Sequence, residues 1–186
     1  MKKILMTLVV AAMALNVFAA NPLKVKDGDK KFFKKSKGDC LLEVIYTGAS
    51  FDGKMPLTEK YNDIDNKTTV SYNGFVEEYN DRQKNLPVVK DATNAKYKIT
   101  IQVTKIDEFY NVMGFIPGPC IRVWGTLTVT DINDGSTLLV VDIDEIDGGS
   151  APNVDRAFND TFGELGKKIA KRSEEHTSEL QSRSDL

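Results

Sequence analysis

The 186-residue sequence is 41% hydrophobic and 28% charged, and its formal net charge is −2. These proportions are close to those of ordinary globular proteins, and they exclude a disordered chain, a collagen and a bundle of membrane helices. The near balance of charge indicates no general attraction to nucleic acid or anionic lipid.

The N-terminus has the pattern of a secretory signal peptide. Lys2 and Lys3 precede an apolar stretch over residues 4–18, and the small residue Ala19 suits a cut directly after it. The stretch is too short for a stable membrane span, and no cysteine stands beside the cut to carry a lipid. We therefore expect residues 1–19 to be a signal peptide and the chain to be exported, periplasmic or extracellular, and not lipid-anchored. A buried N-terminal helix is the alternative.

Residues 20–39 are rich in lysine and carry Phe32 and Phe33 in their middle. Basic segments with aromatic residues can bind anionic lipid or polymer. A solvated arm, or an edge strand whose lysines discourage further pairing, is the more common meaning of such a segment. We predict an N-terminal arm or edge strand here.

The next elements are a short strand and a helix. Residues 41–47 form a β-rich apolar run typical of a buried strand. Over residues 68–86 the apolar side chains fall on one helical face, although Gly74 weakens the helix and Pro87 limits it.

Three strands follow, each with apolar and polar residues in alternation. The third strand returns after a turn at residues 131–136, of the Asp/Asn-Gly type. We expect an antiparallel meander with these side chains facing inward: Tyr97, Ile99, Ile101 and Val103; Ile121, Val123, Leu127 and Val129; and Leu139, Val141 and Ile143.

Gly148 and Gly149 are expected to end the third strand, and a last amphipathic helix is predicted over residues 153–171 with Asn153 as its N-cap. The predicted fold is α+β: a two-layer sandwich in which two helices cover one face of a mainly antiparallel sheet. The sheet has about four strands in the order β-α-β-β-β-α. Residues 40–171 would form this single domain.

Residues 172–186 are polar and follow a helix that ends at Lys171. Residues 172–182 resemble the in-frame translation of a sequencing adapter, so the segment is expected to be non-native; a disordered tail is the alternative. His176, the only histidine of the chain, lies within it.

Residues 20–171 therefore contain no histidine, and they contain no nucleophile-elbow, P-loop or dinucleotide motif. We expect no catalytic residue, cofactor or metal site, and so no enzyme. The alternative is a carboxylate-based hydrolase or a calcium-dependent carbohydrate-binding module that uses Asp142 and Asp144 on the outer sheet face.

Cys40 and Cys120 are the only cysteines. An oxidising compartment permits a disulfide between them, and both precede predicted strands. Two separate buried thiols are the alternative, since connectivity cannot be deduced from spacing.

The most unusual segment is the loop predicted over residues 109–119, because it is apolar where the tips of two strands should be exposed. Such a loop indicates a surface that binds a protein or polymer partner; a satellite core folded over the sheet end is the alternative. The predicted partner-binding residues are Phe109, Tyr110, Val112, Met113, Phe115, Ile116 and, on the neighbouring outer strand face, Trp124. The partner's identity and the oligomeric state stay open.

Residues 95–107, residues 124–149 and the helix end GELGKKIAK resemble small exported bacterial envelope proteins. The architecture is similar to that of the TolB amino-terminal domain and of the activator lipoproteins of penicillin-binding proteins. This resemblance implies protein binding in the cell envelope without chemistry. The chain departs from those lipoproteins by lacking a lipid-attachment cysteine.

Overall fold

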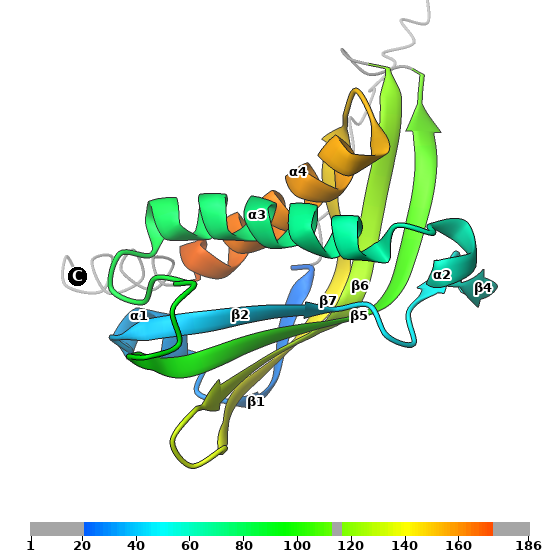
Figure 1. The fold of residues 1–186 in the computed structure, drawn as a ribbon. Coiled ribbons are helices and arrows are strands. Elements are labelled where there is room, and N and C mark those ends of the chain that lie inside the picture. Colours follow the sequence, from blue (N-terminus) through cyan, green and yellow to red (C-terminus); the bar gives the residue numbers. More distant parts are fainter. Residues whose placement is uncertain (1–20, 113–116, 173–186) are drawn as a thin grey trace, which may run out of the picture.

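The computed structural model describes residues 21–112 and 117–172. Within them the chain forms one seven-stranded sheet with helices packed on one side (Figure 1). The elements in chain order are β1 (Leu23–Gly28), α1 (Phe32–Lys35), β2 (Asp39–Ile45), β3 (Ser50–Phe51), β4 (Met55–Pro56), α2 (Leu57–Lys60), α3 (Ile64–Arg82), β5 (Ala95–Asn111), β6 (Gly118–Asp131), β7 (Thr137–Ser150) and α4 (Val154–Lys171).

The predicted sheet of about four strands in the order β-α-β-β-β-α is wrong. The described residues hold seven strands and four helices, and the sheet is mixed because β2 and β3 both run parallel to β5. β3 and β4 have two residues each, too few to create a periodic pattern. β1 is the edge strand that was one of the two alternatives for the lysine-rich segment, and it was not counted among the four strands.

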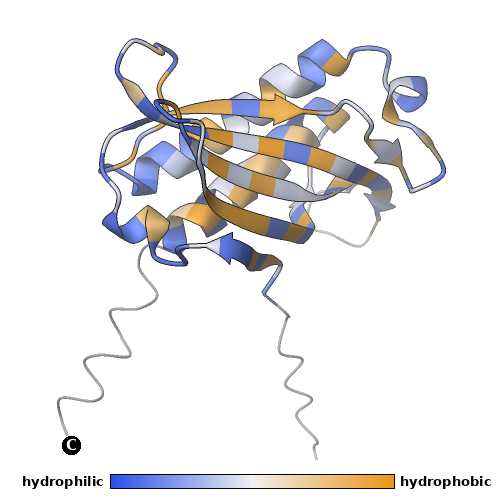
Figure 2. Cartoon of the chain, turned by 90° about the horizontal axis from the view of Figure 1, so that it is seen from below, coloured by the Kyte–Doolittle hydropathy of each residue, from blue (hydrophilic) through white to orange (hydrophobic). Residues whose placement is uncertain are grey.

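The strands follow the order β1-β7-β6-β5-β3-β4, and β2 pairs with β5 beside β3. The antiparallel meander of β5, β6 and β7 is confirmed, and all eleven side chains predicted to face inward are buried. Figure 2 shows the opposite face of the sheet, where the alternating colours along the strands reflect this division.

A β-bulge divides β5 into two parts. The register with β6 shifts between Val103 and Lys105, so the chain gains one residue relative to its partner. Before the bulge Ile101 and Val103 face the helices; after it Ile106 is the buried residue. The bulge therefore exchanges the faces to which odd and even residues of β5 point.

β7 does not end at Gly148 and Gly149 as predicted but continues to Ser150. A Cβ atom on Gly148 would lie 2.4 Å from the backbone nitrogen of Thr161 on α4. The glycine therefore permits the helix to pass close to the strand rather than ending the strand.

The two long helices pack against each other and against the sheet (Figure 1). α4 buries the predicted stripe of Phe158, Phe162, Leu165 and Ile169, and the Asn153 side chain accepts a hydrogen bond from the Arg156 N–H at 2.8 Å. This confirms both the helix and its N-cap. α3 begins and ends four residues earlier than predicted.

The lysine-rich segment is built into the fold. β1 pairs with β7 at the edge of the sheet, and Phe32 and Phe33 of α1 are buried in the core. The two aromatic side chains thus belong to the hydrophobic core and do not form an exposed basic and aromatic patch.

Candidate functional site

The outer end of the β5–β6 ribbon extends past α3 and α4 (Figure 1), and β7 accompanies β6 as far as the pair Cys120 and Ser150. We call residues 105–112 and 117–124 the distal hairpin. Its strands stay paired as far as Asn111 and Gly118. The loop predicted over residues 109–119 is therefore too long, because its first three residues belong to β5 and its last two to β6. Met113, Phe115 and Ile116 lie outside the described residues.

One face of the distal hairpin presents apolar side chains to solvent. Tyr110 is 64% exposed and Val112 is 71% exposed, the highest values among the large hydrophobic residues that the structure describes. Tyr110 follows Ile106 at even spacing, so it points to the helix-side face of the ribbon, but it lies beyond the helices that cover that face. Its side chain is therefore not part of the hydrophobic core, whereas that of Ile106 is.

The other face holds Phe109 and Trp124, which are half-buried. The Arg122 guanidinium lies 4.1 Å from the centroid of the Phe109 ring, and the Lys105 ammonium lies 3.4 Å from that of Trp124. Arg122 also lies within ion-pair distance of Glu145, at 3.3 Å. The predicted binding residues that the structure describes therefore divide between two faces, and Phe109 and Trp124 already have cationic neighbours within the chain.

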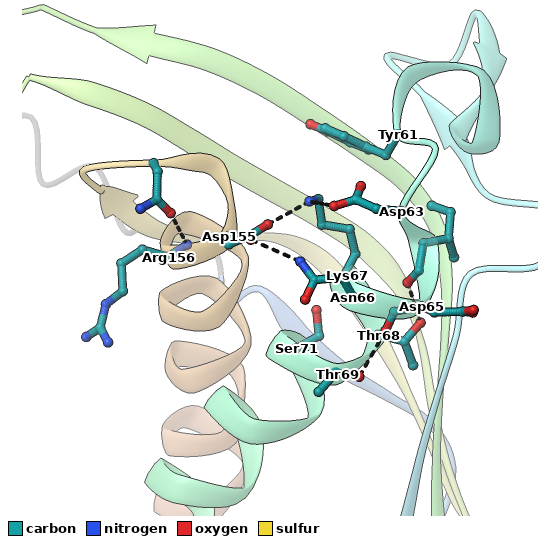
Figure 3. A network of polar contacts seen from close by, with 12 residues as sticks. Tyr61, Asp63, Asp65, Asn66, Lys67, Thr68, Thr69, Ser71, Asp155 and Arg156 are labelled. Atoms are coloured by element: carbon teal, nitrogen blue, oxygen red, sulfur yellow. Dashed lines mark hydrogen bonds and ion pairs between the residues drawn. The ribbon is translucent and has the colours of Figure 1, made fainter.

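A polar cluster links α3 to α4 (Figure 3) and reaches the distal hairpin through Glu108. We call Tyr61, Asp63, Lys67, Glu108 and Asp155 the Lys67 cluster. The ammonium group of Lys67 donates to Asp63 at 2.7 Å and to Asp155 at 2.6 Å, which ties α3 to the first turn of α4. The Tyr61 hydroxyl donates to Glu108 of β5 at 2.7 Å.

Lys67 is the unusual member of this cluster because only 6% of its side chain is exposed. Its ammonium lies 5.5 Å from the Tyr61 ring centroid. Burial lowers the pKa of Lys67, but the two carboxylates outweigh burial, and the pKa is raised above its ordinary value. The ammonium is therefore charged and bound at neutral pH. Its two hydrogen bonds link α3 to α4.

Sequence reasoning missed the Lys67 cluster. Asp63 and Lys67 have the i, i+4 spacing of a helical ion pair, and this was the only available signal. Asp155 and Glu108 are distant in sequence, so their participation depends on the packing of α4 and β5 against α3.

On the outer face of β7, both carboxylates of the alternative site form ion pairs with lysines of β1. Asp144 lies 2.9 Å from the Lys24 ammonium, and Asp142 lies 2.9 Å from that of Lys26. The hydrogen bond from Lys24 holds the pKa of Asp144 below its ordinary value. Within the described parts of the chain, no group of three or more metal-ligating side chains comes together.

Cys40 and Cys120 are both buried and unbridged. Cys40 pairs with Tyr97 on β5 and Cys120 with Phe109, at opposite ends of the same strand. Twelve residues separate these two partners, which corresponds to a path on the order of 40 Å along the strand. The disulfide considered from the sequence is therefore incompatible with the fold, because bridged cysteines need Cα atoms within about 7 Å.

Among the helices of residues 21–112 and 117–172, none has both the length and the apolar character needed to cross a membrane.

No protein-family model matches the chain, and no curated protein sequence matches it. Solved structures with a similar arrangement include the PelC dodecamer from Paraburkholderia phytofirmans, with a TM-score of 0.41 and 11% identity over 78% of this chain and 96% of that one. Protein XCC0632 from Xanthomonas campestris has a TM-score of 0.38 and 11% identity over 85% and 96%. A putative neuraminyllactose-binding hemagglutinin homolog from Helicobacter pylori has a TM-score of 0.35 and 13% identity over 82% and 91%. Similarity at this level assigns neither a family nor a function to the chain.

Proposed function

We propose that the chain is an exported, non-enzymatic binding protein that holds a protein or polymer partner at the tip of the distal hairpin. The observation that carries this proposal is the exposure of Tyr110 and Val112 on a ribbon that extends beyond the helix layer. Exposed apolar side chains grouped at such a position are typical of interaction surfaces. Export is proposed from the pattern of residues 1–19.

Tyrosine suits this role because its ring supplies a large contact area and its hydroxyl can bond to a partner. Val112 is two residues further along and adds an apolar contact. The Lys67 cluster fixes the base of the hairpin, so that a partner meets a strand pair that is already ordered. This arrangement limits the entropy lost on binding.

The lack of catalysis is proposed from the residue types available. Between residues 20 and 171 there is no histidine, and the acidic pair Asp142 and Asp144 is bound to lysines. The paired carboxylates also weaken the case for a hydrolase or a calcium-dependent binder.

Site-specific photo-crosslinking tests the proposal. A photoreactive phenylalanine analogue replaces Tyr110 in one preparation and Ile132 in another, and each is irradiated with bacterial envelope extract. Ile132 is a matched control because it is also an exposed apolar residue, 42% exposed, but lies in the turn after the opposite end of β6. We expect a discrete adduct from position 110, lost when Val112 is replaced by Ser, and none from position 132.

Equal labelling at the two positions would contradict a specific surface at the hairpin tip. A Tyr110→Ser, Val112→Ser variant that unfolds would show instead that these side chains contribute to the core. Its thermal unfolding should therefore be measured beside that of Ile132→Ser.

A further inference from the structure

The outer edge of β2 carries a regular row of backbone N–H and C=O groups. Only the groups at the start of the strand have hydrogen-bond partners within the described chain. The Gly38 N–H donates to the Asn85 carbonyl at 3.0 Å, and the Cys40 N–H donates to the Pro87 carbonyl at 2.8 Å. The Val89 N–H in turn donates to the Cys40 carbonyl at 2.8 Å. Residues 85–89 therefore lie along the start of β2 and make a parallel bridge at Cys40 and Val88.

The same alternation continues along the strand. In a parallel ladder the N–H and C=O groups of every second residue point to the same neighbour. Since those of Cys40 point away from β5, those of Leu42 and Val44 do so as well. Within the described residues nothing bonds to these outward groups, because the chain leaves the edge after Val89.

A groove of about 500 Å³ lies beside this open edge. Its walls are Leu41 to Glu43 of β2, Tyr72 of α3, Val89, Lys90 and Lys98. Lys98 is neutralised by Glu43, whose carboxylate lies 2.7 Å from the Lys98 ammonium. Lys90 is exposed, and in the described chain it has no carboxylate within ion-pair distance.

We propose that this open edge binds an extended peptide, which adds to the sheet beside β2. Its backbone would pair in parallel with Leu42 and Val44 and continue the register of residues 85–89. An acidic residue near its beginning would meet Lys90, and an apolar side chain on its helix-facing side would meet Tyr72. The row of alternating donors and acceptors defines the ligand as a strand, and the uncompensated lysine defines its charge.

A second copy of the chain is a less suitable occupant. An antiparallel pair of β2 strands centred on Glu43 would place the two Glu43 side chains directly opposite each other, and like charges in that position are destabilising. The experiment must therefore also be able to detect self-association through this edge.

The probe is a fluorescein-labelled, end-capped peptide, Glu-Val-Thr-Val-Thr-Val, whose binding to the full chain is followed by fluorescence anisotropy. Two further versions carry N-methyl groups on its odd or its even residues. Because only alternate N–H groups face β2, we expect one version to lose at least about tenfold in affinity and the other to bind like the parent peptide. Equal effects of the two methylation patterns would overturn the proposal.

Two variants of the chain locate the site. Leu42→Pro removes an outward N–H without removing a hydrogen bond to β5, and it should weaken binding by at least about tenfold. Lys90→Glu should reverse the charge preference, so that a probe beginning with Lys binds more tightly than the original. The matched control is Lys26→Glu on β1, at the opposite edge of the sheet, which should leave both probes unchanged.

The charge reversal keeps the test decisive if Leu42→Pro destabilises the fold, because a damaged fold cannot gain affinity for a Lys-bearing probe. The Tyr110→Ser, Val112→Ser variant should bind the peptide normally. The proposed binding at the hairpin and the proposed peptide binding at β2 can therefore be tested separately. A concentration-dependent dimer in analytical ultracentrifugation that Leu42→Pro abolishes would assign this edge to a second copy and overturn the peptide proposal.

Discussion

Gly74 of α3 lies directly against Asn159 of α4: a Cβ atom built on the glycine would be 2.1 Å from the Asn159 carbonyl oxygen. The two helices therefore cross with their backbones almost in contact. Glycine weakens an isolated helix, but here the missing side chain is what permits the helices to pack. The residue that counts against α3 in the sequence is a requirement of the tertiary structure.

Gly74→Ala should consequently destabilise the protein although alanine is the better helix former. We expect a loss of about 2–4 kcal/mol in the free energy of unfolding, because the neighbouring atom is backbone and cannot turn aside. Chemical denaturation measures this change. Gly163→Ala is the matched control, since its Cβ would meet the flexible Glu78 side chain at 3.3 Å. A small effect at Gly74 and a large one at Gly163 would contradict the observed helix crossing.

Lys67→Met should also destabilise the fold, because it removes a buried ammonium that holds carboxylates from two helices. We expect a loss of about 1–3 kcal/mol, at the level of charge-assisted hydrogen bonds. Lys54→Met is the control: Lys54 pairs with Asp52, but its side chain is 78% exposed, and such surface pairs contribute about 0–1 kcal/mol. Equal losses in the two variants would mean that the Lys67 cluster does not connect the helices as described.

Stability should fall in acid partly through Asp63. The hydrogen bond from Lys67 lowers the pKa of this carboxyl below its ordinary value of 3.8. Its contribution to stability is therefore fully present above that value and is lost as the pH falls through the lower pKa of the folded state. The difference in unfolding free energy between the natural chain and Asp63→Asn should be measurable near pH 6 and should shrink towards about pH 2.5. A difference independent of pH would exclude this ion pair as its cause.

The two thiols should remain free in the folded protein, even after export to an oxidising compartment. Burial raises the pKa of the Cys40 thiol to about 12, so it should react with a thiol reagent such as Ellman's only after unfolding. Two thiols should then be titrated in denaturant without prior reduction, and a reducing agent should leave the melting temperature unchanged. A loss of stability on reduction would contradict the positions of the cysteines at opposite ends of β5.

The exposed tip of the distal hairpin could be located in the sequence because apolar residues are unusual at the junction of two strands. The faces to which these residues point could not be predicted, since they depend on the bulge after Val103. One extra residue in β5 places Tyr110 on one side and Phe109 on the other. A bulge leaves no periodic signal of its own in so short a stretch.

Local periodicity in the sequence predicts the three-stranded meander, the last helix with its cap, and the side chains that fill the core. Alternation and helical spacing involve residues that are close in sequence, so these features can be predicted wherever the pattern is long enough. Three other features depend on the packed fold: the parallel pairing of β2 with β5, the open edge that this pairing leaves, and the contact of Lys67 with Asp155. These contacts join segments far apart in the sequence, and their energies arise only once the sheet and the two helices have packed together.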